Sequence, residues 1–303
     1  MPRRLAASLA AALLLPALAL AQGMAGHDHD HGADPAAAAA PARDPNLPAG
    51  EEGAKDALEH SPRHGEYQDV PMPGGGAPLR TWIAYPERAD KAPVVLIIHE
   101  IFGLSDWIRA VADQLARDGF IAVAPDLVSG MGPDGGGTES FPGRDSVVAA
   151  IRRVTPQVAW ERLDAARAWA TALPSANGRC ATVGFCWGGA RSFDYAAARP
   201  ELAAAVVYYG AAPDSASLAR LQVPVLGLYG GDDARVNATI EPAKRVLAAA
   251  GIKKYQAQTF DGAGHGFLRQ QAGREGANLR ATQAAWPRTL TFLRAGLNAK
   301  PRK

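Results

Sequence analysis

Cys186 lies in the stretch Gly184-Phe185-Cys186-Trp187-Gly188, the thiol version of the Gly-x-Ser-x-Gly pattern in which a strand turns sharply into a helix. Such a turn needs glycine on both sides because neighbouring Cβ atoms would collide. The amides and dipole of a helix N-terminus favour a thiolate, so we expect a reactive nucleophile at Cys186. A lone cysteine after an apolar strand is otherwise a small buried hydrophobe, so this interpretation needs support from elsewhere in the chain.

A thiol nucleophile needs a base that takes its proton and a third group that orients the base. When such a turn follows a strand of a parallel sheet, the usual chain order is nucleophile, acid, histidine. Asp232 and Asp233 follow an expected strand at 223–229, and His265 follows another at 254–260. We therefore expect His265 to be the base, with either aspartate as its partner.

Further candidates follow the apolar run 94–98. The backbone amides of Ile101 and Trp187 are expected to hold the oxyanion that forms during acyl transfer, usually the largest single catalytic effect. Glu100 is a carboxylate at the end of a buried strand, where an unpaired charge is costly. Arg269, in the same loop as the expected base, is its expected partner.

Strand-like and helix-like segments alternate along the chain, which predicts an α/β fold with a doubly wound, mostly parallel sheet. Ligands bind at the carboxyl ends of the strands in such sheets, and every candidate above lies at such an end. The expected strands are 79–85, 94–98, 120–124, 179–183, 203–209, 223–229 and 254–260, and the expected helices are 105–118, 145–153, 156–172, 189–198 and 278–297.

The composition is that of an ordinary globular protein. The chain has 303 residues, of which 48% are hydrophobic and 20% charged, and its net charge is +2. No basic run predicts a nucleic-acid groove. We expect no cofactor and no resident metal, and the oligomeric state is not readable from the sequence.

The first 60 residues differ from the rest of the chain. Residues 1–21 have a basic start, an apolar run and a small-residue cleavage site, which predicts a signal peptide rather than a membrane anchor, and a periplasmic or secreted protein. The Arg3-Arg4 pair leaves twin-arginine export open. The composition of residues 22–60 predicts a disordered linker, which precedes a domain at 61–303. The run His27–His31 could bind zinc or copper, although a solvated linker is the favoured interpretation.

The two cysteines, Cys180 and Cys186, are not expected to form a disulfide. Extended backbone between them would place their Cα atoms roughly 18–20 Å apart, beyond disulfide reach. Cys186 should therefore remain a free thiol.

Residues 64–297 resemble the dienelactone hydrolase family of the α/β-hydrolase fold. Four stretches in the right order carry the resemblance: His99-Glu100-Ile101-Phe102-Gly103, Gly184–Gly189, Gly230–Val236 and Gly264-His265-Gly266-Phe267. The resemblance implies a triad of Cys186, His265 and Asp233, the aspartate three residues before Val236. It also implies that Glu100 helps to activate the thiol, and that Arg269 pairs with Glu100 and with a substrate carboxylate.

One departure from the family concerns the substrate. Family members carry a second substrate-binding arginine after Pro-Asp-Leu, whereas here Pro125-Asp126-Leu127 is followed by Val128-Ser129-Gly130. Arg144 could replace that arginine from a distance. We therefore expect an exported hydrolase of a small ester or lactone, not necessarily a dienelactone. The alternatives are an exported non-catalytic binding protein for a small acid or metal, and a redox-sensing role for Cys186.

Overall fold

Long apolar runs form the centre of the molecule, because a strand that is covered on both faces needs hydrophobic side chains on both. The computed structural model describes residues 44–299, which form one eight-stranded sheet in the order β1-β2-β4-β3-β5-β6-β7-β8. β1 and β2 pair antiparallel with each other, β2 pairs antiparallel with β4, and the remaining pairs are parallel. The strands are β1 (Gly65–Val70), β2 (Leu79–Ala84), β3 (Ala92–Ile98), β4 (Ile121–Pro125), β5 (Ala176–Phe185), β6 (Ala205–Tyr208), β7 (Val225–Gly230) and β8 (Tyr255–Phe260).

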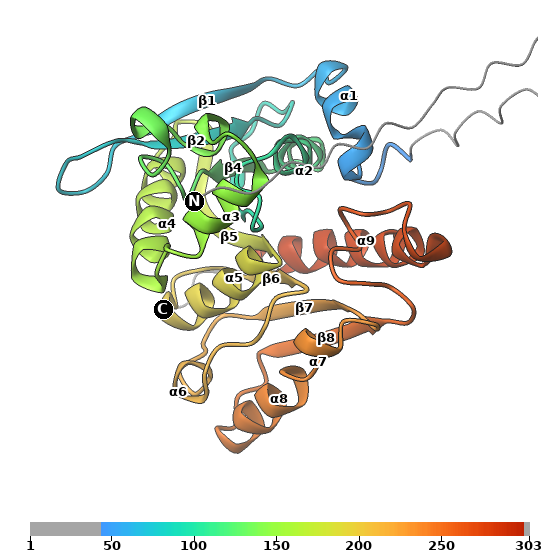
Figure 1. The fold of residues 1–303 in the computed structure, drawn as a ribbon. Helices are drawn as coiled ribbons and strands as arrows, with labels where there is room; N and C mark the ends of the chain where they lie inside the picture. The colour runs from blue at the N-terminus through green and yellow to red at the C-terminus, as the bar shows by residue number, and fades with distance from the viewer. Residues whose placement is uncertain (1–43, 300–303) are drawn as a thin grey trace, which may run out of the picture. The chain divides into compact units, whose positions relative to one another are not determined.

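Helices cover both faces of this sheet (Figure 1). α2 and α9 bury their apolar side chains against one face, and α4, α5 and α8 bury theirs against the other. The doubly wound, mostly parallel sheet expected from the sequence is therefore confirmed. The helices are α1 (Ala54–Glu59), α2 (Asp106–Arg117), α3 (Arg144–Ile151), α4 (Pro156–Thr171), α5 (Trp187–Ala198), α6 (Ser215–Leu218), α7 (Ala234–Asn237), α8 (Ile240–Ala249) and α9 (Ala277–Asn298).

β3 shows how the sequence produces the two layers. All seven of its residues are buried, and successive side chains point to opposite faces. Val95 and Ile97 join the core beneath α2 and α9, whereas Leu96 and Ile98 join the core beneath α4 and α5. Each inner strand thus ties the two cores together and ends at the same edge of the sheet.

The linker prediction is wrong for residues 44–60. Glu51–Gly53 form a 3-10 helix that continues into α1, and α1 packs against α2. Leu47 and Ala49 are buried in the core. The composition did not indicate this because only a few small apolar residues dock, and they dock onto a surface built by distant parts of the chain. The domain therefore begins before residue 61.

The two cysteines of the described part agree with the sequence. Cys180 and Cys186 are both free thiols, as expected. Within residues 44–299 no helix is long and apolar enough to cross a bilayer, and no three side chains of the metal-binding types cluster. The predicted signal peptide at 1–21 and the run His27–His31 lie outside the described residues.

Candidate active site

Cys186 occupies the turn between β5 and α5 with φ 55° and ψ −115°. A positive φ costs a non-glycine residue about 1–3 kcal/mol and persists only where the surroundings impose it. Here the amide of Cys186 donates to the carbonyl of Tyr208 at 3.0 Å, and the amide of Ala190 donates to the carbonyl of Cys186 at 3.1 Å. The neighbouring strand and the first turn of the helix therefore hold the thiol at the edge of the sheet.

The two glycines of the turn are required by close packing and not by their own dihedral angles. A Cβ on Gly184 would lie 2.0 Å from the carbonyl oxygen of Gly188. A Cβ on Gly188 would lie 2.1 Å from the carbonyl oxygen of Ile98 and 2.3 Å from that of His99. The turn thus lies directly against the end of β3, where Glu100 and Ile101 follow.

His265 and Asp233 form a close pair, with Nδ1 of the imidazole 2.5 Å from Oδ2 of the carboxylate. Asp233 follows β7 and is 7% exposed, while His265 lies in the loop after β8. Asp232 instead pairs at the surface with Arg274, at 2.9 Å. The structure therefore shows which of the two aspartates pairs with His265, a choice that the loop sequence left open.

Glu100 pairs with Arg269, as expected, with Oε1 of the carboxylate 3.0 Å from Nε of the guanidinium. Burial raises the pKa of Glu100 to about 7, and Arg269 opposes this rise without cancelling it. The charge of Glu51 raises the same pKa further. Glu100 is therefore a carboxyl group that changes its charge near neutral pH.

The thiol of Cys186 is protonated at rest. Burial raises its pKa to about 11, with a further increase from the negative charge of Glu100. The amide of Trp187 at the start of α5 lowers the pKa by a smaller amount. The helix N-terminus thus favours the thiolate, as expected, but burial and a neighbouring carboxylate outweigh its effect on the pKa.

The peptide between Glu100 and Ile101 is oriented by His99. The amide of Leu127 donates to Nε2 of His99 at 3.0 Å, which leaves the ring proton on Nδ1, 2.9 Å from the carbonyl oxygen of Glu100. In a trans peptide the N–H points opposite to the C=O, so the Ile101 amide points away from His99. The ring of His99 also stacks on Trp187, with centroids 5.8 Å apart. His99 thus links the two loops that carry the expected oxyanion donors.

Tyr209 is a site residue that the sequence reasoning missed. It follows β6 with φ 41°, its ring centroid lies 5.1 Å from that of His265, and its buried hydroxyl has no hydrogen-bond partner among residues 44–299. Burial raises its pKa well above the usual value, and the charges of Glu100 and Cys186 add to the rise. Its position immediately after a strand was the available signal. The site therefore contains a buried donor beside the expected base.

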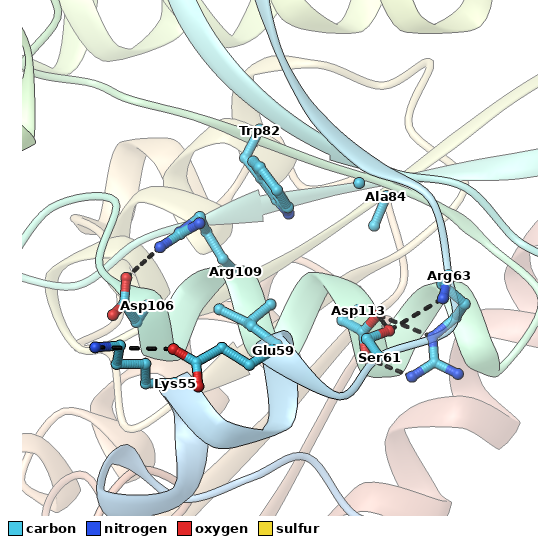
Figure 2. A pocket seen from close by; sticks show the side chains of 11 residues that line it. Lys55, Glu59, Ser61, Arg63, Trp82, Ala84, Asp106, Arg109 and Asp113 are labelled. Atoms are coloured by element: carbon cyan, nitrogen blue, oxygen red, sulfur yellow. Dashed lines mark hydrogen bonds and ion pairs between the residues drawn. The ribbon is translucent and has the colours of Figure 1, made fainter.

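A groove of about 300 Å³ between α1, β2 and α2 shares no residue with this cluster (Figure 2). Its charged side chains are paired with one another, and the pairs are Lys55 with Glu59, Arg63 with Asp113, and Arg109 with Asp106. A groove whose charges are already neutralised offers little to a charged substrate. The chemistry-bearing residues lie instead at the carboxyl ends of β3, β5, β6, β7 and β8.

The sheet, the sharp turn after β5 and the loops that follow β7 and β8 define an α/β-hydrolase fold. A family model described as "Dienelactone hydrolase family" matches residues 79–297. The chain therefore belongs to the dienelactone hydrolase family and is a hydrolase of that kind.

Proteins similar to this chain agree with that assignment. Two bacterial relatives carry the name "Putative carboxymethylenebutenolidase". The Salmonella typhimurium protein is 32% identical over 234 residues, covering 73% of this chain and 84% of the relative. The Yersinia pestis protein is 30% identical over 261 residues, covering 81% and 95%. The crystal structure of a "Putative Dienelactone Hydrolase" from Klebsiella pneumoniae superposes with a TM-score of 0.67 at 27% identity, covering 76% of this chain and 98% of that one.

Proposed function

We propose that this protein hydrolyses a small ester or lactone through a covalent acyl-enzyme on Cys186. The observation that carries the proposal is the pair of buried Asp233 and half-buried His265, 2.5 Å apart, in the loops that follow β7 and β8. The thiol lies at the end of β5 in the same sheet, in the strained turn that exposes a nucleophile. A nucleophile, a base and a group that orients the base are the parts that acyl transfer requires.

In the first step the sulfur of Cys186 attacks the carbonyl carbon while His265 accepts the thiol proton. The amides of Ile101 and Trp187 hold the oxyanion. When the tetrahedral intermediate collapses to a thioester, His265 gives the proton to the departing oxygen. For a lactone, that oxygen remains attached to the acyl group.

In the second step water attacks the thioester and His265 takes its proton. The sulfur leaves as a thiolate, is protonated again by His265, and the acid is released. Burial, with a further contribution from the charge of Glu100, keeps the resting thiol protonated and hence protected, since thiolates are the form that oxidants attack. A thiolate of high pKa is also intrinsically the stronger nucleophile once it forms, which is how Glu100 would help to activate Cys186.

Export is part of the same proposal. Residues 1–21 have the composition of a cleaved signal peptide, and the mature protein would act in the periplasm or outside the cell. Fractionation of the producing cells, with mass spectrometry of the mature N-terminus, tests this. A mature chain that still begins at Met1 in the cytoplasm would contradict it.

Hydrolysis of 4-nitrophenyl acetate by wild type, Cys186→Ala and Cys180→Ala tests the nucleophile. Cys180 is a buried free thiol in β5 and serves as the matched control. We expect wild type and Cys180→Ala to turn over the ester and Cys186→Ala to lose at least about a thousandfold in kcat. A thioester adduct, with a mass increase of one acetyl group, should be trapped on Cys186. Undiminished turnover by Cys186→Ala would rule out this mechanism, and no turnover by wild type would favour a binding protein.

A further inference from the structure

Glu51 bridges two arginines that come from distant parts of the chain. One oxygen of its carboxylate pairs with Nη2 of Arg144, at the start of α3, and the other with Nη1 of Arg269. Both guanidinium groups also face the ring of Phe102, at 4.7 Å and 5.1 Å from its centroid. Two guanidiniums that share one carboxylate form a carboxylate-binding position.

This position adjoins the reacting groups. Nε of Arg269 lies 3.0 Å from Oε1 of Glu100, and Phe102 follows Ile101 directly in the loop that carries the expected oxyanion donor. The charges of Glu51 and Arg144 shift the pKa of Glu100 in opposite directions, so the two are electrostatically coupled to the active-site carboxyl. The charge of a carboxylate bound at this position therefore affects the pKa of Glu100.

The backbone around Glu51 holds its side chain in place. Its amide donates to the carbonyl of Arg269 at 2.9 Å, and the side-chain amide of Gln271 donates to the carbonyl of Pro48 at 2.9 Å. Leu47 and Ala49 are buried beneath this segment. None of these contacts uses the carboxylate, so we expect the segment to stay docked when the Glu51 side chain is substituted.

The local charges are balanced while Glu51 is in place and Glu100 is ionised, which holds above about pH 7. Arg144 and Arg269 contribute two positive charges, and Glu51 and ionised Glu100 contribute two negative ones. A substrate carboxylate would have to displace Glu51 or add an uncompensated negative charge. Without Glu51 the same position would carry an excess positive charge and an empty carboxylate site.

We propose that Glu51 determines substrate specificity by filling this position with the chain's own carboxylate. The enzyme then favours esters or lactones that are uncharged at this end, and loss of Glu51 opens the position to carboxylate-bearing substrates. This proposal rests on the hydrolase function above for its catalytic part. The carboxylate-binding part stands on the two arginines alone.

The first experiment compares 4-nitrophenyl hexanoate with the mono-4-nitrophenyl ester of adipic acid, which carries a carboxylate in place of the terminal methyl group. We expect Glu51→Ala to raise the ratio of kcat/KM for the charged over the neutral ester by about tenfold or more, as is usual for a charged hydrogen bond. Glu52→Ala, which changes an exposed neighbour in the same 3-10 helix, should leave the ratio unchanged. Adding Arg144→Gln to Glu51→Ala should abolish the gain.

The second experiment needs no catalysis. Acetate is small enough to occupy the space that Glu51→Ala leaves, so acetate, at constant ionic strength with chloride, should raise the Tm of that variant. Wild type, Glu52→Ala and the double variant Glu51→Ala/Arg144→Gln should not respond. An equal response in all four proteins would overturn the carboxylate-binding position.

The two experiments separate the possible failures. An acetate response with an unchanged ester ratio would overturn the specificity role while keeping the binding position. If wild type and Glu51→Ala hydrolyse neither ester, the hydrolase proposal and the specificity role both fail. The acetate measurement then still decides whether the arginines bind a carboxylate.

Discussion

Oδ2 of Asp233 lies 2.5 Å from Nδ1 of His265, so a buried carboxylate holds the imidazole by one nitrogen and leaves Nε2 for the proposed reaction. In the proposed reaction this carboxylate would also stabilise the imidazolium that forms when the ring takes a proton. The adjacent Asp232 has a different task, because it pairs with Arg274 at the surface. Substitutions of these two consecutive aspartates therefore compare a carboxylate that contacts His265 with one that does not.

Asp233→Asn should lower kcat by roughly a hundredfold to ten-thousandfold, because the amide no longer holds the ring in the reactive tautomer. Asp232→Asn, the matched control, should stay within about twofold of wild type. Steady-state kinetics with a neutral aryl ester measures both. A larger loss in Asp232→Asn than in Asp233→Asn would exchange the roles of the two residues.

Alkylation of Cys186 should be slow at pH 7 and should accelerate as the pH rises. A thiol with a pKa of about 11 gains about tenfold in thiolate per pH unit well below that value. Iodoacetamide labelling followed by mass spectrometry from pH 7 to pH 10 measures this, with Cys186→Ser as control. Glu100→Gln should label faster, since one negative charge beside the sulfur is removed. A labelling rate that is already constant across this range would contradict a protonated resting thiol.

The free energy of unfolding should depend on pH because of Glu100. Between the ordinary carboxyl pKa of 4.5 and about 7, the unfolded chain is ionised at this residue while the folded chain remains protonated. The free energy of unfolding therefore falls as the pH rises through this window, by at most about 3 kcal/mol.

Urea unfolding at pH 5 and pH 8 measures this contribution. Relative to wild type, Glu100→Gln should gain stability at pH 8 over pH 5, because the glutamine cannot ionise. Glu52→Gln, at an exposed position, is the control. The same difference from wild type at both pH values would show that Glu100 does not titrate in this window.

Gly188→Ala should destabilise the protein by about 3 kcal/mol or more, because the new methyl group would overlap the backbone carbonyls that end β3. Gly53 is the matched control, with φ −98° and nothing within 4 Å of an added Cβ. Gly53→Ala should change stability by less than about 1 kcal/mol, in the stabilising direction. Thermal unfolding compares the two variants. Equal effects would show that the turn after β5 can move away from the end of β3 and make room for a methyl group.

Tyr209→Phe should separate stability from activity. Removing a buried hydroxyl that lacks a partner should leave the Tm unchanged or raise it. If the hydroxyl donates to the bound substrate, kcat/KM should fall about tenfold or more. Unchanged kinetics with a raised Tm would show that this hydroxyl has no part in the reaction.

The positions of the candidate residues could be predicted because each follows directly on a local pattern. The apolar run 94–98 predicted a central strand, and the observed β3 extends it by two residues to Ala92–Ile98. β1 was less visible, because its six residues include Glu66, Gln68 and Asp69 and it lies at the edge of the sheet. Edge strands need little apolar alternation and so leave a weak signal.

Two features could not be read from local sequence because both depend on tertiary contacts. The pKa of Cys186 is raised by burial and by Glu100, neither of which the turn motif reveals. Glu51 meets Arg269, which lies 218 positions further along the chain. No pattern around residue 51 could indicate which side chains it would reach.

The hydrogen bond between Pro48 and Gln271 joins positions 223 residues apart, and it has a consequence for the order of assembly. Residues 47–51 leave the ribosome early, yet their docking surface exists only after β8 and the following loop have folded. Contacts of such long range form late. The amino-terminal segment should therefore stay accessible to proteases until the carboxy-terminal part is in place.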